Sequence, residues 1–204
     1  MSFGAPFPGS AINLVYNTSP ALVTTTLPVT FTGVSIGPAN ATRVVVIATM
    51  IGATSDTTGI TIGGISATKV AAGQSGSGVI SFGDLWAAVV PSGTSANIVL
   101  SGSVVGSARV GISSYSIYGT QSATPASVLN GANGNLIGIQ VAIGSSCNED
   151  AGAQSWSGVV SDFSSSISGG AGHTFFMSSA SKGQVVSSFA VSVTNGGGFC
   201  FAGW

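Results

Sequence analysis

At 204 residues, the chain is long enough for one all-β domain that buries roughly 70% of the surface its unfolded form exposes, so a core needs no metal or disulfide. Only 4% of the residues are Asp, Glu, Lys or Arg, against about 25% in ordinary domains, and the formal net charge is −1. This balance excludes the basic surface that nucleic acid or an anionic membrane would require. A charge-poor surface tends to associate, so we expect a subunit largely covered by neighbours, with an uncharged polar monomer as the alternative.

Mean hydropathy is +0.57, but no segment is typical of a membrane span. The longest apolar run, Val44–Ala53, is interrupted by Thr49 and Gly52 and has half the length of a spanning helix. The N-terminus has no Lys or Arg followed by an apolar stretch, so we expect no signal peptide. The Ser/Thr/Gly-rich composition is nevertheless typical of extracellular proteins. A virion protein, made in the host cytoplasm and released by lysis, satisfies both conditions.

The chain begins with a proline-containing segment, residues 1–20, that predicts an arm or an edge segment. After it, β-branched and aromatic runs alternate with Gly/Ser/Pro clusters, most clearly between Gly59 and Leu100. The expected strands, in chain order, lie at 12–16, 27–31, 43–51, 59–70, 79–90, 96–100, 109–118, 137–143, 156–163, 173–178, 185–194 and 199–204.

Three of these segments carry more specific predictions. The 43–51 run is almost continuously apolar and predicts a central strand. The apolar face of 109–118 switches sides, which predicts a bulge near Ser113. Residues 137–143 have the cleanest period-2 pattern, and the segments on either side of 156–163, at 144–153 and 164–172, are expected to be loops.

Short strands spaced 8–15 residues apart, without a helical period, predict an all-β, jelly-roll-like antiparallel β-sandwich. Segments 21–119 and 136–204 resemble each other in order, which suggests two four-stranded Greek-key halves of one jelly roll, joined by the polar segment 120–135. The 43–49 run is matched to 136–144, 79–88 to 173–180, and 109–118 to 185–194. We expect one domain, 21–204, after the N-terminal arm.

Cys147 and Cys200 lack the spacing of a zinc site, so two alternatives remain: two buried thiols or one disulfide. In an extended strand, Cys200 points away from Phe199 and Phe201.

Two patterns raise the possibility of hydrolase chemistry. Gly33–Gly37 matches G-x-S-x-G, but that elbow requires a following helix, and Pro38 and a strand follow here. His173, the single histidine, would form a triad with Asp162 and a serine. We expect it instead to be a loop or strand residue bonded to backbone.

The chain has five acids: Asp56, Asp84, Glu149, Asp150 and Asp162. A glycosidase needs two positioned carboxylates, but we expect Asp84 to cap a turn or to pair with Arg43, Arg109 or Lys69. Glu149 and Asp150, with Asn148, would offer oxygen ligands to calcium, although no D-x-D loop supports this. The sequence therefore predicts no enzyme, no cofactor and no metal. Trp86, Trp156 and Trp204 fit either a sugar-stacking platform or the core, and we expect the core.

Four runs carry a family resemblance: R-V-V-V-I-A-T, I-T-I-G-G-I-S-A-T, D-L-W-A-A-V-V-P-S-G-T-S-A-N-I-V-L and G-I-S-S-Y-S-I-Y-G. Over residues 30–120 they resemble small proteins of tailed phages and prophages of alphaproteobacteria. The resemblance implies a β-sandwich virion protein, of the capsid decoration or tail/fibre accessory type, and transfers no functional residues.

We therefore expect a non-enzymatic virion structural protein that docks on other virion proteins, or on its own copies as a symmetric homo-oligomer, through apolar and backbone contacts. The expected interface residues are Phe3, Phe7, Phe199, Phe201 and Trp204. The alternatives are a carbohydrate- or host receptor-binding module that uses tryptophan and the 144–153 loop, or a self-assembling extracellular filament subunit.

Overall fold

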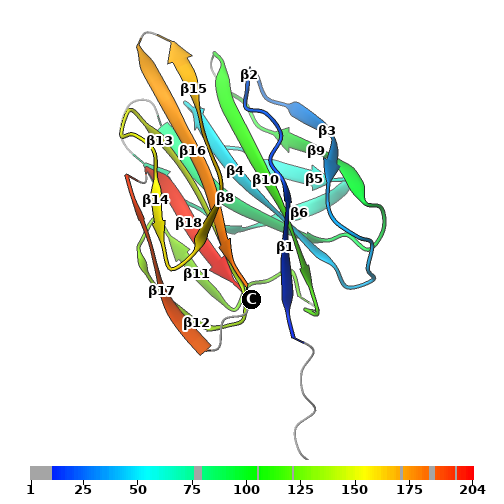
Figure 1. Cartoon of the computed structure of the whole chain (residues 1–204). Helices are drawn as coiled ribbons and strands as arrows, with labels where there is room; N and C mark the ends of the chain where they lie inside the picture. Colours follow the sequence, from blue (N-terminus) through cyan, green and yellow to red (C-terminus); the bar gives the residue numbers. More distant parts are fainter. Residues whose placement is uncertain are drawn as a thin grey trace, which may run out of the picture.

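The computed structural model describes residues 11–75, 80–104, 106–120, 122–170, 172–183, 187–195 and 197–204, without the side chains of 187–189. Every regular element in this part of the chain is a β-strand, and all the strand pairs are antiparallel (Figure 1). The predicted all-β antiparallel sandwich is confirmed. The described residues contain no helix of the length and apolarity needed to cross a membrane.

The first half of the chain forms a complete jelly roll of eight strands and two short additions. Its sheet path runs β1-β10-β4-β8-β6-β5-β9-β3, with β2 beside β10 and β7 beside β8. β6 belongs to both sheets, because Ile65–Ala67 pair with β5 and Thr68–Ala71 pair with β8. If β2 and β7 are left out, the remaining eight strands can be numbered from first to eighth in chain order. One sheet then has the order first-eighth-third-sixth and the other second-seventh-fourth-fifth, which is the order of a jelly roll. The strands are β1 (Asn13–Thr18), β2 (Val23–Thr25), β3 (Val29–Ser35), β4 (Val44–Ala53), β5 (Gly59–Ile62), β6 (Ile65–Ala71), β7 (Gln74–Ser75), β8 (Ile80–Val89), β9 (Ser95–Ser101) and β10 (Ala108–Tyr118).

The second half repeats this topology strand for strand. One sheet has the order β11-β18-β13-β16-β15 and the other β12-β17-β14, so the first-eighth-third-sixth and second-seventh-fourth series recur. Here the fifth strand, β15, is hydrogen-bonded to β16. The strands are β11 (Ser127–Asn130), β12 (Gly134–Ile139), β13 (Ala142–Glu149), β14 (Ser155–Ser157), β15 (Val160–Gly170), β16 (His173–Lys182), β17 (Ser187–Thr194) and β18 (Gly198–Gly203).

The repeated unit is therefore larger than the four-stranded Greek key that the sequence suggested. Each half is an eight-stranded jelly roll. The predicted match between 79–88 and 173–180 is confirmed, since β8 and β16 are both sixth strands. The other two matches were wrong: β4 corresponds to β13 rather than to 136–144, and β10 corresponds to β18 rather than to 185–194.

In each roll, the larger sheet is the one that contains the first, eighth, third and sixth strands. The two jelly rolls stack through these larger sheets, giving four layers of strands (Figure 1). One core lies inside the first roll and another inside the second. Between the rolls, a third core joins side chains of β4, β8 and β10 to those of β13 and β18, and a smaller cluster joins Met50 to Cys147, Phe175 and Met177. β4 is consequently buried along its whole length, as predicted for a central strand.

Glycines allow the two larger sheets to approach closely. A Cβ on Gly83 of β8 would lie 2.5 Å from the carbonyl oxygen of Gly198 and 2.9 Å from that of Ser145. A Cβ on Gly52 would overlap the ring of Phe175. The backbones of the two rolls therefore contact each other directly at Gly83, and at Gly52 the backbone of the first roll packs against a side chain of the second.

The bulge predicted near Ser113 lies on the neighbouring strand β1 and not on β10 itself: Tyr16 pairs with Tyr115 and Thr18 with Ser114, so the register shifts at Asn17. β10 pairs with β4 without interruption from Arg109 to Ile117. Its apolar side switches because both faces are buried: Val110 and Ile112 face the first roll's core, while Tyr115 and Ile117 face the second roll.

The single strand predicted from the period-2 pattern at 137–143 was also wrong. The segment spans two strands of different sheets, β12 and β13, and a register shift at Gly138 places both Leu136 and Ile139 in the second roll's core. The expected loops at 144–153 and 164–172 instead contain most of β13 and the end of β15.

Arg43 is fully buried beside the first roll's core and donates hydrogen bonds only to backbone carbonyl groups. Its Nε bonds Val90 O at 2.9 Å, and its two terminal nitrogens bond the carbonyl oxygens of Gly37, Pro38, Ser92 and Gly93 at 2.6–3.0 Å. The side chain thus fixes the loops on either side of it.

Candidate functional site

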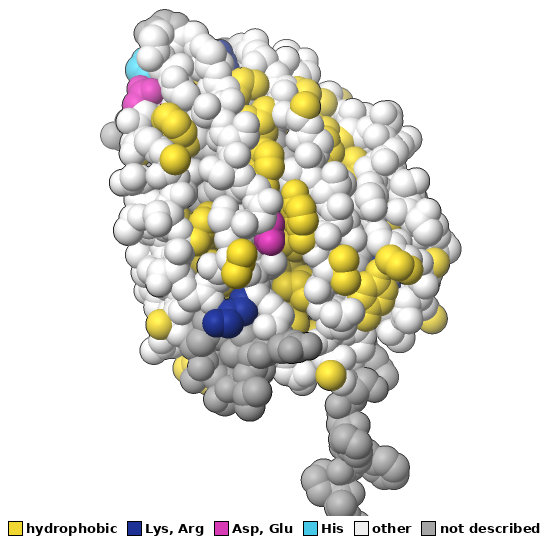
Figure 2. Space-filling model, in the orientation of Figure 1, with side chains coloured by type: hydrophobic (Ala, Val, Ile, Leu, Met, Phe, Trp, Pro, Cys, Tyr) yellow, Lys and Arg dark blue, Asp and Glu magenta, His cyan; other side chains and the backbone are white. Residues whose placement is uncertain are grey.

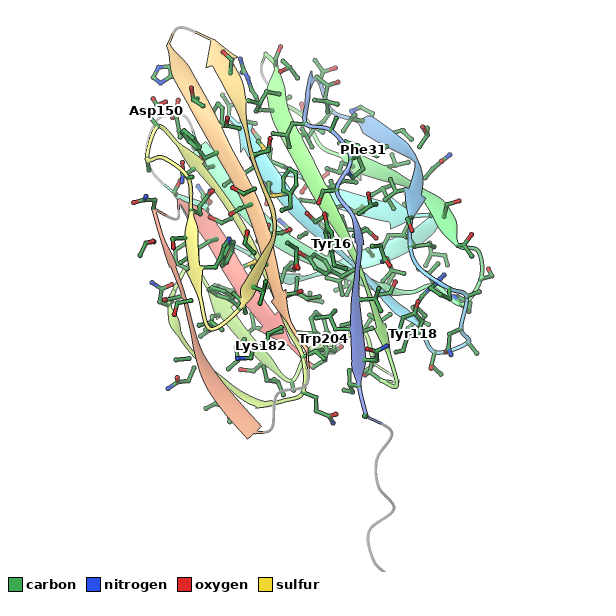
Figure 3. The ribbon with its side chains drawn as sticks, in the orientation of Figure 1. Tyr16, Phe31, Tyr118, Asp150, Lys182 and Trp204 are labelled. Atoms are coloured by element: carbon green, nitrogen blue, oxygen red, sulfur yellow. The ribbon has the colours of Figure 1, made fainter. Side chains whose placement is uncertain are left out.

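The most concentrated group of chemically reactive side chains lies where β13 ends and β16 begins. These strands are neighbours, with Glu149 opposite Phe175, so Glu149 and Asp150 lie beside His173. His173 Nδ1 is 2.7 Å from Asp150 Oδ2 and 3.1 Å from Glu149 Oε1. Figure 2 shows acidic and histidine side chains together at one corner of the molecule, and Figure 3 labels Asp150 there.

The electrostatics of this cluster favour a charged imidazole. The hydrogen bond to Asp150, and then the charge of Glu149, raise the pKa of His173. The Thr174 N–H donates to Asp150 Oδ1 at 2.7 Å, and this bond, followed by the one from His173, lowers the pKa of Asp150.

One expectation about this region was wrong. His173 bonds a carboxylate rather than backbone, and the triad partner considered for it, Asp162, hydrogen-bonds elsewhere. Asn148 Nδ2 donates to the carbonyl oxygens of Gly152 and Asn195, while its Oδ1 is buried and has no hydrogen-bond partner among the described residues. Sequence spacing missed His173 because it lies 23 residues from Asp150 along the chain.

A second charged group lies in the first roll, where Asp84 is buried and Lys69 and Asp56 are partly exposed. Lys69 Nζ bonds Asp84 Oδ2 at 2.9 Å and also Asp56 Oδ2, and it lies 4.9 Å from the ring centroid of Trp86. The expected pairing of Asp84 with Lys69 is confirmed. Burial, and then the charge of Asp56, raise the pKa of Asp84 to about 7 against the opposing effect of Lys69. Burial alone would lower the pKa of Lys69, but its bonds to Asp56 and Asp84 raise it.

A polar network crosses the seam between the rolls. Tyr115 of β10 donates to Ser179 Oγ at 2.8 Å and lies 3.1 Å from Asp162 Oδ2, while Ser179 bonds Ser113 at 2.7 Å. Burial raises the pKa of both Tyr115 and Asp162. These groups therefore hold the two rolls in register.

A shallow groove of about 570 Å³ lies on the outer face of the first roll's smaller sheet. Its polar side chains are Thr61, Ser95 and Asn97, and glycines form much of its floor. Asn97 Oδ1 accepts a hydrogen bond from Gly33 N at 3.1 Å, which fixes the amide. The groove offers hydroxyl and amide groups to a neutral polar ligand.

The tryptophans do not form a platform. Trp86 and Trp204 are 4% exposed, and the partly buried Trp156 packs edge-on against Phe201 and donates to Ser178 Oγ. The core role is confirmed. Ser35, within G-x-S-x-G, is the last residue of β3 and is followed by a turn and then β4, not by a helix.

Cys147 and Cys200 are free and buried. They lie on the neighbouring strands β13 and β18 but out of register, with Cys147 opposite Gly198 and Cys200 opposite Ser145. The buried-thiol alternative is the one observed. Cys200 does point away from Phe199 and Phe201, since it faces the core between the rolls while they face the second roll's core.

The expected interface role was wrong for two residues of the C-terminal segment. Phe201 is fully buried and Trp204 is 4% exposed, because β18 lies inside its sheet between β11 and β13. Phe199 is partly buried against the second roll's core. Phe3 and Phe7 lie outside the described residues.

No protein family, curated protein or solved structure matches the chain.

Proposed function

We propose that this protein is a non-enzymatic structural subunit of a phage particle, either a capsid decoration protein or a tail/fibre accessory. The observation that carries the proposal is the fusion of two complete jelly rolls through a buried common face. Jelly rolls recur in viral capsids, but also in lectins and cupins, so the fold by itself does not decide the function.

The use of the ionisable groups supports a structural role. Arg43 bonds backbone carbonyls, Lys69 bonds Asp84, and Asp162 bonds Tyr115 across the seam, so each stabilises the fold. With charge this scarce, apolar and backbone contacts would dominate docking.

Two apolar side chains of the second roll are candidates for such contacts. Ile137 of β12 is 66% exposed and Val160 of β15 is 69% exposed. Both strands lie at edges of their sheets, where strand addition by a neighbour is available.

Mass spectrometry of gradient-purified particles tests the proposal. We expect the chain in many copies per particle, in a fixed ratio to the major capsid or tail protein, and an oligomer of the isolated protein by light scattering. Absence of the chain from purified particles would overturn the proposal.

A second candidate function is glycan binding, favoured by the groove lined by Thr61, Ser95 and Asn97. A glycan array probed with wild type and Asn97→Ala distinguishes the two. Glycan binding by wild type that the substitution abolishes would support the second candidate. Filaments seen by electron microscopy of the purified protein would instead indicate a self-assembling fibre subunit.

A further inference from the structure

We propose that Glu149, Asp150 and His173 bind a divalent transition-metal ion of the Zn²⁺ class. Each residue offers one ligand atom, and these atoms lie within 4.8 Å of one another. The site is distinct from the contacts that carry the structural proposal.

The first argument is that one proton cannot satisfy this arrangement. His173 Nδ1 lies 2.7 Å from Asp150 Oδ2, with which it forms a hydrogen bond, and 3.1 Å from Glu149 Oε1. Glu149 Oε1 is buried and has no hydrogen-bond partner among the described residues, despite its proximity to the ring. The Nδ1–H forms its hydrogen bond with Asp150, whereas a cation between the three atoms would contact all of them.

The second argument is geometric. In a tetrahedral zinc site with bonds of 2.0–2.2 Å, the ligand atoms lie about 3.3–3.6 Å apart. The nitrogen–oxygen distances of 2.7 and 3.1 Å are shorter than this. An outward movement of the half-exposed His173 and Asp150 side chains would therefore admit the ion, and the fourth position would be open to water.

The frame around the cluster limits how far these groups can move apart. β13 and β16 are paired up to Glu149 and Phe175, and Asp150 N donates to Thr174 O at 2.9 Å. Asp150 Oδ1 accepts from Thr174 N, which orients Oδ2 toward the ring, as an outer partner orients a metal-bound carboxylate.

The donor set favours a transition metal over calcium. Ca²⁺ takes six to eight oxygen ligands, whereas imidazole suits Zn²⁺ and its neighbours.

Isothermal titration calorimetry of the full chain with ZnCl₂ at pH 7.5 tests this inference, with CaCl₂ titrated in parallel. We expect one Zn²⁺ per chain and weaker or undetectable Ca²⁺ binding. His173→Ala and Asp150→Asn should each weaken Zn²⁺ binding at least tenfold. The matched control is Asp162→Asn, which removes one carboxylate outside the cluster and should bind Zn²⁺ as wild type does.

Thermal unfolding with and without ZnCl₂ gives an independent readout. The midpoint should rise with Zn²⁺ for wild type and Asp162→Asn but not for His173→Ala, and circular dichroism verifies that each variant is folded. No Zn²⁺ binding by wild type, equal binding by folded His173→Ala, or tighter binding of Ca²⁺ would each overturn the proposal.

Discussion

At the scale of single residues, Arg43 illustrates how the chain uses its few charges. Its guanidinium has no solvent exposure and bonds five carbonyl groups around two loops of the first roll. A planar group with five donors suits this arrangement, whereas an ammonium has three donors at a single point.

We predict that Arg43→Lys lowers the free energy of unfolding by about 3 kcal/mol, because hydrogen bonds between charged and neutral groups are each worth about 1.5–3 kcal/mol. Urea denaturation followed by tryptophan fluorescence measures the change. A loss below about 0.5 kcal/mol would show that the carbonyl groups find other partners.

The raised pKa of Asp84 predicts that the stability of the fold depends on pH. Its folded-state pKa is raised to about 7 from 3.8, so the folded state holds this proton more tightly than the unfolded state does. The contribution of Asp84 to stability is therefore greatest in acid and is lost as the pH rises from about 4 to 7.

Asp84→Asn mimics the protonated acid and should remove this dependence. Asp162, whose pKa is also raised, is unchanged in the variant. The free energy of unfolding of wild type, relative to that of Asp84→Asn, should thus fall by at most about 4 kcal/mol between pH 4 and pH 7.5. Urea denaturation of both proteins across this range measures it, and a pH-independent difference would contradict the raised pKa.

At the scale of elements, sequence patterns were reliable where strands are rich in β-branched residues. β4, β8 and β10 were all expected, and they form the middle of the first roll's larger sheet. β13 and much of β15 were missed because they are rich in Ser and Gly, residues with low strand preference. Small side chains are nevertheless what β13 requires, because it packs between two sheets and is almost entirely buried.

For a related reason, the sequence grouped only the two acids of the candidate metal cluster and not its histidine. Glu149 and Asp150 are adjacent in sequence, but the approach of His173 depends on the pairing of β13 with β16. Without β13, no pattern in the sequence places His173 beside the two acids.

Close approach of the sheets gives a prediction for Gly83. A Cβ there would meet backbone atoms of the second roll, so Gly83→Ala should destabilise the protein by about 2 kcal/mol through overpacking. Gly59→Ala in β5 is the matched control, because its Cβ would meet nothing within 4 Å and should change stability by less than about 1 kcal/mol. Equal stability of the two variants in urea would mean that the seam is looser than described.

The exposed apolar residues predict an effect on association. Ile137→Lys combined with Val160→Lys should shift the isolated protein toward the monomer in sedimentation velocity, because a charge would be buried at the contact. Val89→Lys, at the end of β8 and 39% exposed, is the control. Unchanged association of the double variant would place the contact elsewhere.

At the scale of the whole molecule, the two jelly rolls share one buried core. Val44, Val46 and Leu85 of the first roll pack with Val141 and Ile143 of the second. Sequence reasoning predicted repeated halves but not that each is a full jelly roll, because the second half builds its eight strands from far fewer apolar residues.

The shared core predicts that neither roll is stable alone. A fragment of residues 1–119 would expose the apolar face of β4, β8 and β10 to water. We expect it to aggregate or to lack a cooperative unfolding transition, unlike the full chain. A soluble fragment with a sharp transition would show that the first roll folds independently.

Differential scanning calorimetry of the full chain tests the central structural claim, that the two jelly rolls form one unit, most directly. At about 0.7 kcal/mol per residue, unfolding near 60 °C should absorb about 140 kcal/mol in one transition, with equal calorimetric and van't Hoff enthalpies. Two resolved transitions, or a van't Hoff enthalpy of about half the calorimetric value, would contradict it.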